Sequence, residues 1–254
     1  MQPKLLLRIA FAVALCCRTP SGRAETPVNG TGWYGYEGYH PFVEGEPWGA
    51  MIEGYVKRND IILDELSYFG RIGLNYELPK GHRLTGGYAF QYNQPYDSAS
   101  EPYNWWDHRI WEQVMLRYPF GERKRHMLIH RFRMEQRWLE RKEAPDYDET
   151  SDWKFENTFR YMVRLVIPVA EKLSLAFYDE IHLRVPPPSA ERILDQNRVY
   201  GGLIFYLDKR RLWRLETGYM FQSSWNSAET LDERKRINHT LRISITSDAP
   251  FTRK

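Results

Sequence analysis

The sequence predicts an all-β protein: a closed antiparallel up-and-down barrel of outer-membrane type, with about ten strands and twelve as the alternative. Three observations predict it. Apolar and polar residues alternate along most of the chain, the alternating runs are mostly 10 to 15 residues long, and short connections alternate with long ones. Strands of globular proteins average about 5–6 residues, whereas a tilted strand needs about 9–11 residues to cross a bilayer. The length of the runs therefore favours a membrane barrel over a soluble sandwich.

Ten segments carry the two-residue period that a strand imposes on its side chains. In the segment 64–78, every second residue from Leu66 to Leu78 is apolar or glycine, and the residues between them are mostly polar. In the segment 153–167, Lys154, Glu156, Arg160 and Arg164 lie opposite an apolar face. The predicted strands are 48–57, 64–78, 82–93, 107–118, 126–138, 153–167, 172–184, 196–207, 211–222 and 236–246.

The apolar faces are rich in aromatic residues, which indicates contact with lipid. Nine Trp and seventeen Tyr contribute to an aromatic content of 15%, and the aromatic residues tend towards the ends of the faces. Amphipathic rings are favoured at membrane–water interfaces, where barrels carry aromatic girdles. We therefore expect apolar side chains outside and charged side chains inside. Alternation alone also fits the reverse arrangement, in which a soluble barrel encloses an apolar core.

The connections between the predicted strands alternate in length. Bacterial outer-membrane barrels have short periplasmic turns and longer external loops, so this alternation supports the same fold. Ten strands would place both ends of the barrel domain on the short-turn side. The short connections are 79–81, 119–125, 168–171 and 208–210, and the long ones are 94–106, 139–152, 185–195 and 223–235.

The first residues have the pattern of a secretory signal. Lys4 and Arg8 precede an apolar stretch at 9–17, and Gly22 and Ala24 supply the small residues of a cleavage site. We expect cleavage after Ala24. The chain then divides into a signal peptide (1–24), an N-terminal segment (25–47), a β-barrel domain (48–247) and a C-terminal tail (248–254).

Removal of the signal changes the charge and the cysteine content. Four of the 36 Lys and Arg residues lie in residues 1–24, so 32 remain against 33 Asp and Glu, and no nucleic-acid partner is expected. Both cysteines, Cys16 and Cys17, are lost as well. A chain without cysteine has no disulfide, thiolate nucleophile or Cys-based metal site. After residue 24 no run of 18 apolar residues remains, so a membrane span has to be a β-strand.

A run of alternating charges at 131–137 is the sharpest candidate site. On a strand, Arg131, Arg133, Glu135 and Arg137 share one face at steps of about 6–7 Å. Charges enclosed in a narrow barrel have to pair, because an isolated buried charge is very costly. We expect either an Arg/Glu ladder that fills the lumen or a site where surplus arginines bind an anion. The predicted lumen network comprises Arg131, Arg133, Glu135, Arg137, Arg160, Arg164, Glu180, Arg198, Glu216 and Arg242.

No residue pattern indicates catalysis. None of the seven histidines has a serine two residues later, although a pair across strands that involves His239 stays open. The histidines are scattered, so neither a metal site nor a cofactor is expected. Gly86-Gly87 and Gly201-Gly202 lie inside predicted strands and indicate bends or close approaches rather than phosphate loops.

A series of short motifs resembles a bacterial family. Its motifs occur here as Trp111-Glu112-Gln113, the run Arg131 to Arg137, Asp179-Glu180, Gln196-Asn197-Arg198, Glu216-Thr217-Gly218-Tyr219-Met220 and Asn238-His239. Their order along residues 105–245 is similar to that in the family known as domain of unknown function 2490. The resemblance implies an exported β-barrel-like protein and implies no activity.

Together these features predict a non-enzymatic barrel of the bacterial outer membrane, either structural or a narrow conduit that prefers anions. Its expected partners are outer-membrane lipid, the barrel-assembly machinery during export and a small anion. A soluble periplasmic barrel that binds a small apolar ligand is the alternative, and a barrel-embedded lipid hydrolase is a second one.

Overall fold

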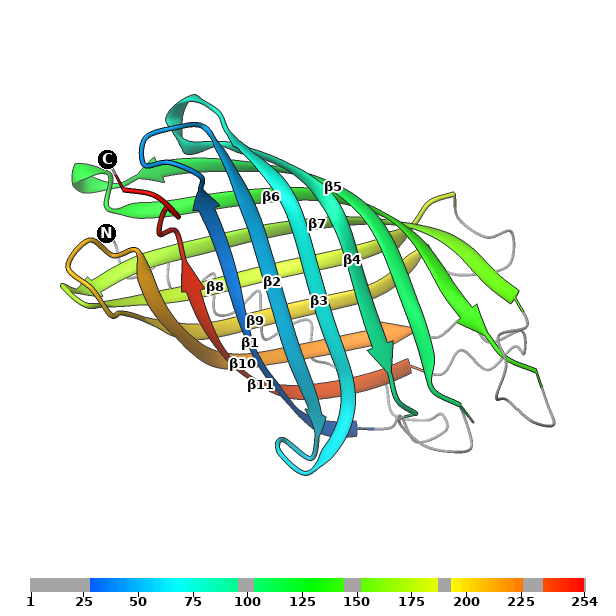
Figure 1. Cartoon of the computed structure of the whole chain (residues 1–254). Helices are drawn as coiled ribbons and strands as arrows, with labels where there is room; N and C mark the ends of the chain where they lie inside the picture. Colours follow the sequence, from blue (N-terminus) through cyan, green and yellow to red (C-terminus); the bar gives the residue numbers. More distant parts are fainter. Residues whose placement is uncertain (1–27, 96–102, 144–151, 187–192, 226–234, 254) are drawn as a thin grey trace.

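The chain forms one closed β-barrel of eleven strands (Figure 1). The computed structural model describes residues 28–95, 103–143, 152–186, 193–225 and 235–253. The expected signal peptide at 1–24 lies outside these residues. The strands are β1 (Val28–Pro41), β2 (Trp48–Asn59), β3 (Asp64–Glu77), β4 (Arg83–Asn93), β5 (Trp105–Phe120), β6 (His126–Arg141), β7 (Asp152–Ala170), β8 (Leu173–Arg184), β9 (Leu194–Tyr206), β10 (Trp213–Trp225) and β11 (Lys235–Ser247).

The barrel closes through a parallel pair. Each strand pairs antiparallel with its sequence neighbours, whereas β1 pairs parallel with β11, from Val28 opposite Ile237 to Gly38 opposite Ser247. In an up-and-down barrel with an odd number of strands, the first and last strands run in the same direction, so the closing pair has to be parallel. The closed, mostly antiparallel barrel is confirmed, and the strand number is eleven.

Strand β1 corrects the expected domain boundary, because it lies inside the segment 25–47 that was predicted to precede the barrel. The barrel starts at Val28 rather than at residue 48. Four glycines, at 30, 32, 35 and 38, interrupt the apolar alternation of this strand, and glycine is depleted in strands in general. Pairing with β2 on one side and β11 on the other stabilises β1 despite this composition.

The two ends of the barrel differ, as predicted from the connection lengths. At one end the strands are joined by 42–47, 78–82, 121–125, 171–172 and 207–212, and we call it the short-turn end. At the other end, the long-loop end, β4, β6, β8 and β10 finish and the four long connections begin. Strand β1 starts at the long-loop end and β11 finishes at the short-turn end, so the expectation that the barrel domain begins and ends on one side is wrong.

The C-terminal tail packs against the short-turn end. Phe251 donates its amide hydrogen to the Pro41 carbonyl, and Thr252 donates to that of Phe42. The Phe251 ring stacks on His40 with the ring centroids 5.0 Å apart. The tail therefore continues the edge formed by the β1–β2 connection.

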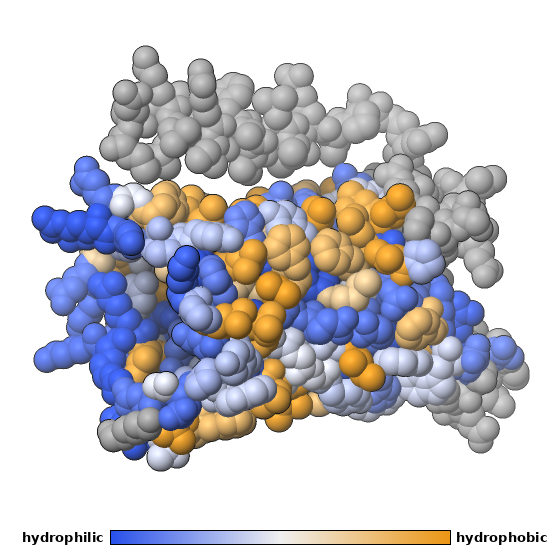
Figure 2. Space-filling view, turned by 90° about the horizontal axis from the view of Figure 1, so that it is seen from above, coloured by the Kyte–Doolittle hydropathy of each residue, from blue (hydrophilic) through white to orange (hydrophobic). Residues whose placement is uncertain are grey.

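The apolar faces of the strands point outwards and the polar faces point into the lumen. On β3, Ile72 and Leu74 are 59% and 52% exposed on the outside, whereas Arg71 is only 4% exposed inside. Figure 2 shows hydrophobic side chains along the wall and hydrophilic ones gathered at the left end of the view. Large apolar side chains exposed on the wall include Leu84, Tyr88, Phe90, Ile110, Val114, Phe132, Phe155, Phe177, Phe205, Tyr219, Leu241 and Ile245.

Polar residues on the outer wall bind one another. Gln136 donates to the Glu112 carboxylate at 3.1 Å, and Asn197 donates to Asp179 at 2.6 Å. His130 forms a hydrogen bond of 2.8 Å with the Tyr161 hydroxyl. Pairing satisfies part of the hydrogen-bonding capacity that an apolar surrounding leaves unmet.

Two inward glycines, Gly87 and Gly202, lie where neighbouring strands approach each other closely, as the sequence predicted. A Cβ on Gly87 would lie 2.1 Å from the Ile72 carbonyl oxygen and 2.5 Å from the Gly73 Cα. The Trp111 ring, which is 1% exposed, packs over Gly73. The strands therefore approach each other closely beneath this ring.

The neighbouring pair Gly86 and Gly87 provides a test of this packing. We expect Gly87→Ala to destabilise the barrel by about 1–3 kcal/mol, because the methyl group overlaps backbone atoms. Gly86 faces outwards, and its added Cβ would lie 3.4 Å from the nearest atom, the Trp111 carbonyl oxygen. Gly86→Ala should therefore unfold in urea at nearly the wild-type concentration. Equal midpoints for the two variants would contradict the close approach of β3 and β4 at Gly87.

Candidate functional site

The lumen encloses a cavity of about 1400 Å³ that reaches both ends of the barrel. Its lining extends from Trp105 and Trp225 near the long-loop end to Tyr206 and Asp248 near the short-turn end. Nineteen Arg and Lys residues line it against nine Asp and Glu residues. The interior is therefore strongly positive and is not filled by its own side chains.

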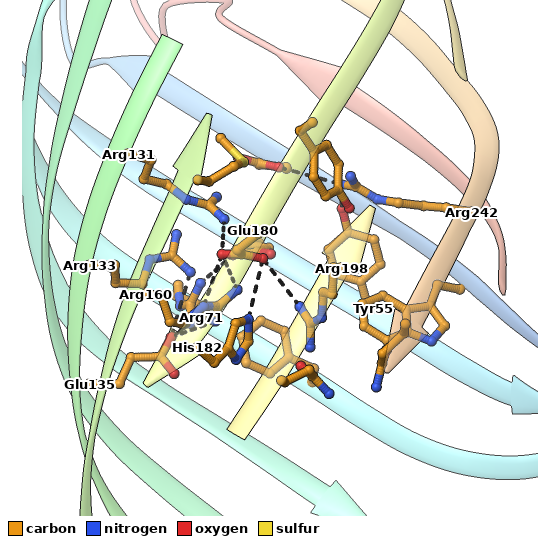
Figure 3. Close-up of a pocket in the computed structure, with 18 of the residues that line it drawn as sticks. Tyr55, Arg71, Arg131, Arg133, Glu135, Arg160, Glu180, His182, Arg198 and Arg242 are labelled. Atoms are coloured by element: carbon orange, nitrogen blue, oxygen red, sulfur yellow. Dashed lines mark hydrogen bonds and ion pairs between the residues drawn. The ribbon is translucent and has the colours of Figure 1, made fainter. Parts of the chain in front are cut away.

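All ten residues of the predicted lumen network point into this cavity. Figure 3 shows Arg131, Arg133, Glu135, Arg160 and Glu180 converging from strands β6, β7 and β8. Residues two apart on one strand share a face, which explains why the charged run of β6 enters the lumen as a unit. The structure thus brings the predicted residues together around two carboxylates.

Glu135 is the centre of the first cluster. Its carboxylate, 1% exposed, accepts hydrogen bonds from Arg71 at 2.7 Å, Arg160 at 2.8 Å and Arg109 at 3.2 Å. A fourth guanidinium, that of Arg133, lies 3.7 Å away. One buried negative charge thus faces four positive charges, and Glu135 links β6 to its neighbours β5 and β7 and, across the lumen, to β3.

Glu180 is the centre of the second cluster. Arg131 and Arg160 donate to it at 2.6 and 2.9 Å, and the Arg198 guanidinium lies 3.6 Å away. His182 places its Nε2 3.4 Å from the same carboxylate. Arg160 binds both Glu135 and Glu180, so the two clusters form a single network.

Further carboxylates surround the two centres. Asp107 accepts from Arg109 at 2.5 Å and from Arg137 at 2.6 Å. Glu53 accepts from Arg71 at 2.9 Å, and Glu216 accepts from Arg164 at 2.6 Å. Arg242 was expected to pair with a glutamate of the predicted network, but it donates to the Tyr55 hydroxyl and lies 3.7 Å from Glu37.

The lumen network, which is part of the cavity lining, contains more positive than negative charge. It adds to the predicted set Lys57, Arg71 and Arg109 on one side, and Glu37, Glu53 and Asp107 on the other. Ten cationic side chains thus face six carboxylates: Lys57, Arg71, Arg109, Arg131, Arg133, Arg137, Arg160, Arg164, Arg198 and Arg242 against Glu37, Glu53, Asp107, Glu135, Glu180 and Glu216.

Aromatic rings and amides also contact the cations of the cavity. Arg133 donates from Nε and Nη2 to the Gln113 side-chain carbonyl at 3.0 and 2.6 Å. The Trp111 ring lies 4.9 Å from Arg71 and 5.2 Å from Arg133. Cation–π contacts stabilise a desolvated guanidinium by about 2 kcal/mol without neutralising its charge.

The short-turn end of the cavity is also basic. Arg83, Arg117, Arg125, Arg211 and Arg214 line it, together with Asp248. Burial raises the pKa of the Asp248 carboxyl, but Arg83 at 3.1 Å and Arg214 at 2.8 Å outweigh this effect and hold its pKa at about 2. Asp248 therefore stays ionised and ties the C-terminal tail to β4 and β10.

Apart from Glu37 on β1, the partners that the sequence did not reveal lie on predicted strands. The sequence shows the polar face of each strand, but not which strands face each other across the lumen. Asp107 and Arg109 are two residues apart, as are the charges of β6, and this spacing could have indicated that both face the lumen. Lys57 and Glu53 show the same spacing on β2 with Tyr55 between them. Which charges meet depends on strand order and register, and a single strand's pattern contains neither.

Two histidines form hydrogen bonds outside the lumen network. His239, the histidine kept open for a serine partner, instead bonds the Tyr219 hydroxyl at 2.5 Å on the outer wall. His40 bonds the Ala249 carbonyl at 2.6 Å. Within the described ranges, no group of three or more His, Cys, Asp and Glu is arranged to hold a metal ion. No helix among those residues has the length and apolarity needed to cross a membrane.

Comparison with known proteins places the chain in a family. The model of the family described as protein of unknown function (DUF2490) matches residues 30–233. The chain belongs to this family. The match begins within β1, so the family pattern includes the strand that sequence reasoning left outside the barrel. Neither a curated protein nor a solved structure matches the chain.

Proposed function

We propose that this DUF2490 protein is an exported β-barrel of the bacterial outer membrane whose cationic lumen admits small anions. The observation that carries the proposal is the excess of nineteen basic over nine acidic residues around a cavity of about 1400 Å³. A positive interior attracts anions and repels cations. Cleavage of the segment 1–24, insertion by the barrel-assembly machinery and contact with outer-membrane lipid belong to the same proposal.

The outer wall supports a membrane location. The strands are 11 to 19 residues long, which is enough for a tilted strand to cross a bilayer. The exposed apolar residues of the wall extend over most of the strands, and so large an apolar surface normally marks contact with a membrane or a partner. A soluble barrel with an apolar ligand would need the reverse arrangement, with apolar residues around the cavity.

The odd strand number sets this barrel apart, because single-chain bacterial outer-membrane barrels have even numbers of strands. With short turns in the periplasm, the start of β1 at Val28 lies on the external side. An epitope tag inserted before Val28 should then bind antibody on intact cells, whereas a tag placed after Thr252 should not. Labelling of only the C-terminal tag would reverse the proposed orientation.

Two measurements test the proposed function. In cell fractionation, the protein should stay in carbonate-washed membranes and should migrate differently on a gel before and after boiling. In a planar bilayer with a salt gradient, the reversal potential should have the sign of anion selectivity. Release into the osmotic-shock fraction would contradict the membrane location, and a reversal potential of opposite sign would contradict the anion preference.

A further inference from the structure

Lys57 differs from the other cations of the lumen network. It lies on β2 towards the long-loop end, and its Nζ is 4.5 Å from the Trp33 ring and 5.8 Å from the Phe69 ring. No carboxylate of the described residues lies within 4.0 Å of its Nζ. Rings stabilise the ammonium group without balancing its charge.

Further positive charge surrounds Lys57. The Arg198 guanidinium lies 5.0 Å from the Trp33 ring, which Lys57 also contacts. The guanidinium groups of Arg71 and Arg109 lie 4.9 and 5.7 Å from the Phe69 ring. Arg71 and Arg109 each bind a carboxylate directly, whereas Arg198 lies 3.6 Å from Glu180. Lys57 and Arg198 are thus two weakly compensated cations that share one indole.

The charge of the missing partner follows from the composition of the lumen network. Ten cations and six carboxylates leave an excess of four positive charges in the lumen network. A single monovalent anion would neutralise only one of them. An ammonium group offers three donors and a guanidinium five, and neither accepts a hydrogen bond. Oxyanions such as phosphate present several acceptor oxygens and match both groups.

We infer that Lys57 and Arg198, walled by Trp33 and Phe69, form a subsite for a small multivalent oxyanion of the phosphate class. The inference rests on the proposed function and names the anion that the lumen prefers. The oxyanion accepts hydrogen bonds from Lys57 Nζ and from the Arg198 guanidinium. It replaces the carboxylate that Lys57 lacks, so its affinity depends on Lys57 more than on other lumen lysines.

The test uses the full chain folded in detergent, with inorganic pyrophosphate titrated by calorimetry in chloride buffer. Lys57→Met should weaken binding by about tenfold or more, the effect expected when one charge-assisted contact is lost. Lys57→Arg should keep most of the affinity. Lys154→Met is the matched control, because Lys154 also lines the lumen but binds Glu156 at 2.5 Å, and its affinity should stay within about twofold of wild type.

The outcomes separate the subsite from the proposed function. Wild-type affinity in Lys57→Met, an equal loss in Lys154→Met or no pyrophosphate binding by the wild type would overturn the subsite. If the bilayer recordings still show anion selectivity, the proposed function stands without it. Cation selectivity of the wild type would instead remove the proposed function. A gel of boiled and unboiled samples checks that each variant is folded.

Discussion

Ile72→Arg is expected to prevent most of the chain from assembling into membranes. Ile72 lies in the middle of β3 and is 59% exposed on the outer wall. An arginine that faces lipid near the bilayer midplane destabilises a barrel by about 2–4 kcal/mol. Urea titration of the barrel in lipid vesicles, followed by its heat-modifiable migration, measures this cost.

Ser224→Arg is the matched control for Ile72→Arg, because it adds the same side chain on the lumen side. Ser224 lines the cavity near the long-loop end, where water solvates an added charge. We expect its unfolding free energy to stay within about 1 kcal/mol of wild type. If Ile72→Arg assembles as well as Ser224→Arg, the outer wall does not face lipid. A soluble barrel would tolerate the arginine at Ile72 better than the isoleucine.

Most of the fold was predictable because long strands with opposite faces leave a strong period in the sequence. The run Leu66 to Leu78 is an example, since every second residue faces outwards on β3. Strand β1 was not predictable in this way. Its glycines carry no side chain to mark a face, and its pairing with β11 joins residues about 200 positions apart, from Val28 to Ile237. This pairing also determines the odd strand number.

The predicted site was correct in its location and incomplete in its membership. The run from Arg131 to Arg137 placed the network on one face of one strand. The closest partner of Glu135, however, is Arg71 on β3, and strands β4 and β5 lie between them in the barrel wall. Contacts across a lumen depend on how the sheet curves and closes. The cavity size was also missed, because it depends on glycines and strand number.

Glu135→Gln is expected to destabilise the barrel by about 3–5 kcal/mol where its surroundings are dry, and by less where water from the cavity reaches it. The change removes the negative charge with which Arg71, Arg109, Arg133 and Arg160 all pair. Three of these arginines keep another carboxylate, whereas Arg133 keeps the neutral Gln113 and the Trp111 ring. Urea titration in vesicles provides the measurement.

Glu156→Gln is the control for Glu135→Gln. Glu156 also lines the lumen, but its side chain is 17% exposed and it pairs with a lysine, Lys154, whose side chain is 32% exposed. Removal of an ion pair that water reaches costs no more than about 1 kcal/mol. Similar losses in the two variants would show that the Glu135 cluster is solvated like a surface and does not hold the strands together.

The variant Arg133→Gln distinguishes a lumen network that is only structural from one that also admits anions. If the network is only structural, the loss of a positive or of a negative charge destabilises the barrel. Arg133→Gln should then lower the unfolding free energy about as much as Glu135→Gln does. In a lumen with surplus positive charge, Arg133→Gln relieves repulsion from Arg71, Arg131 and Arg160, and Glu135 keeps three arginines. We expect the second result: a net loss of no more than about 1.5 kcal/mol, because the relief of repulsion offsets part of the lost contacts with Gln113 and Trp111, with a reversal potential shifted towards cations. Poor assembly of both variants, together with a wild type that shows no anion preference, would leave the network as scaffold alone.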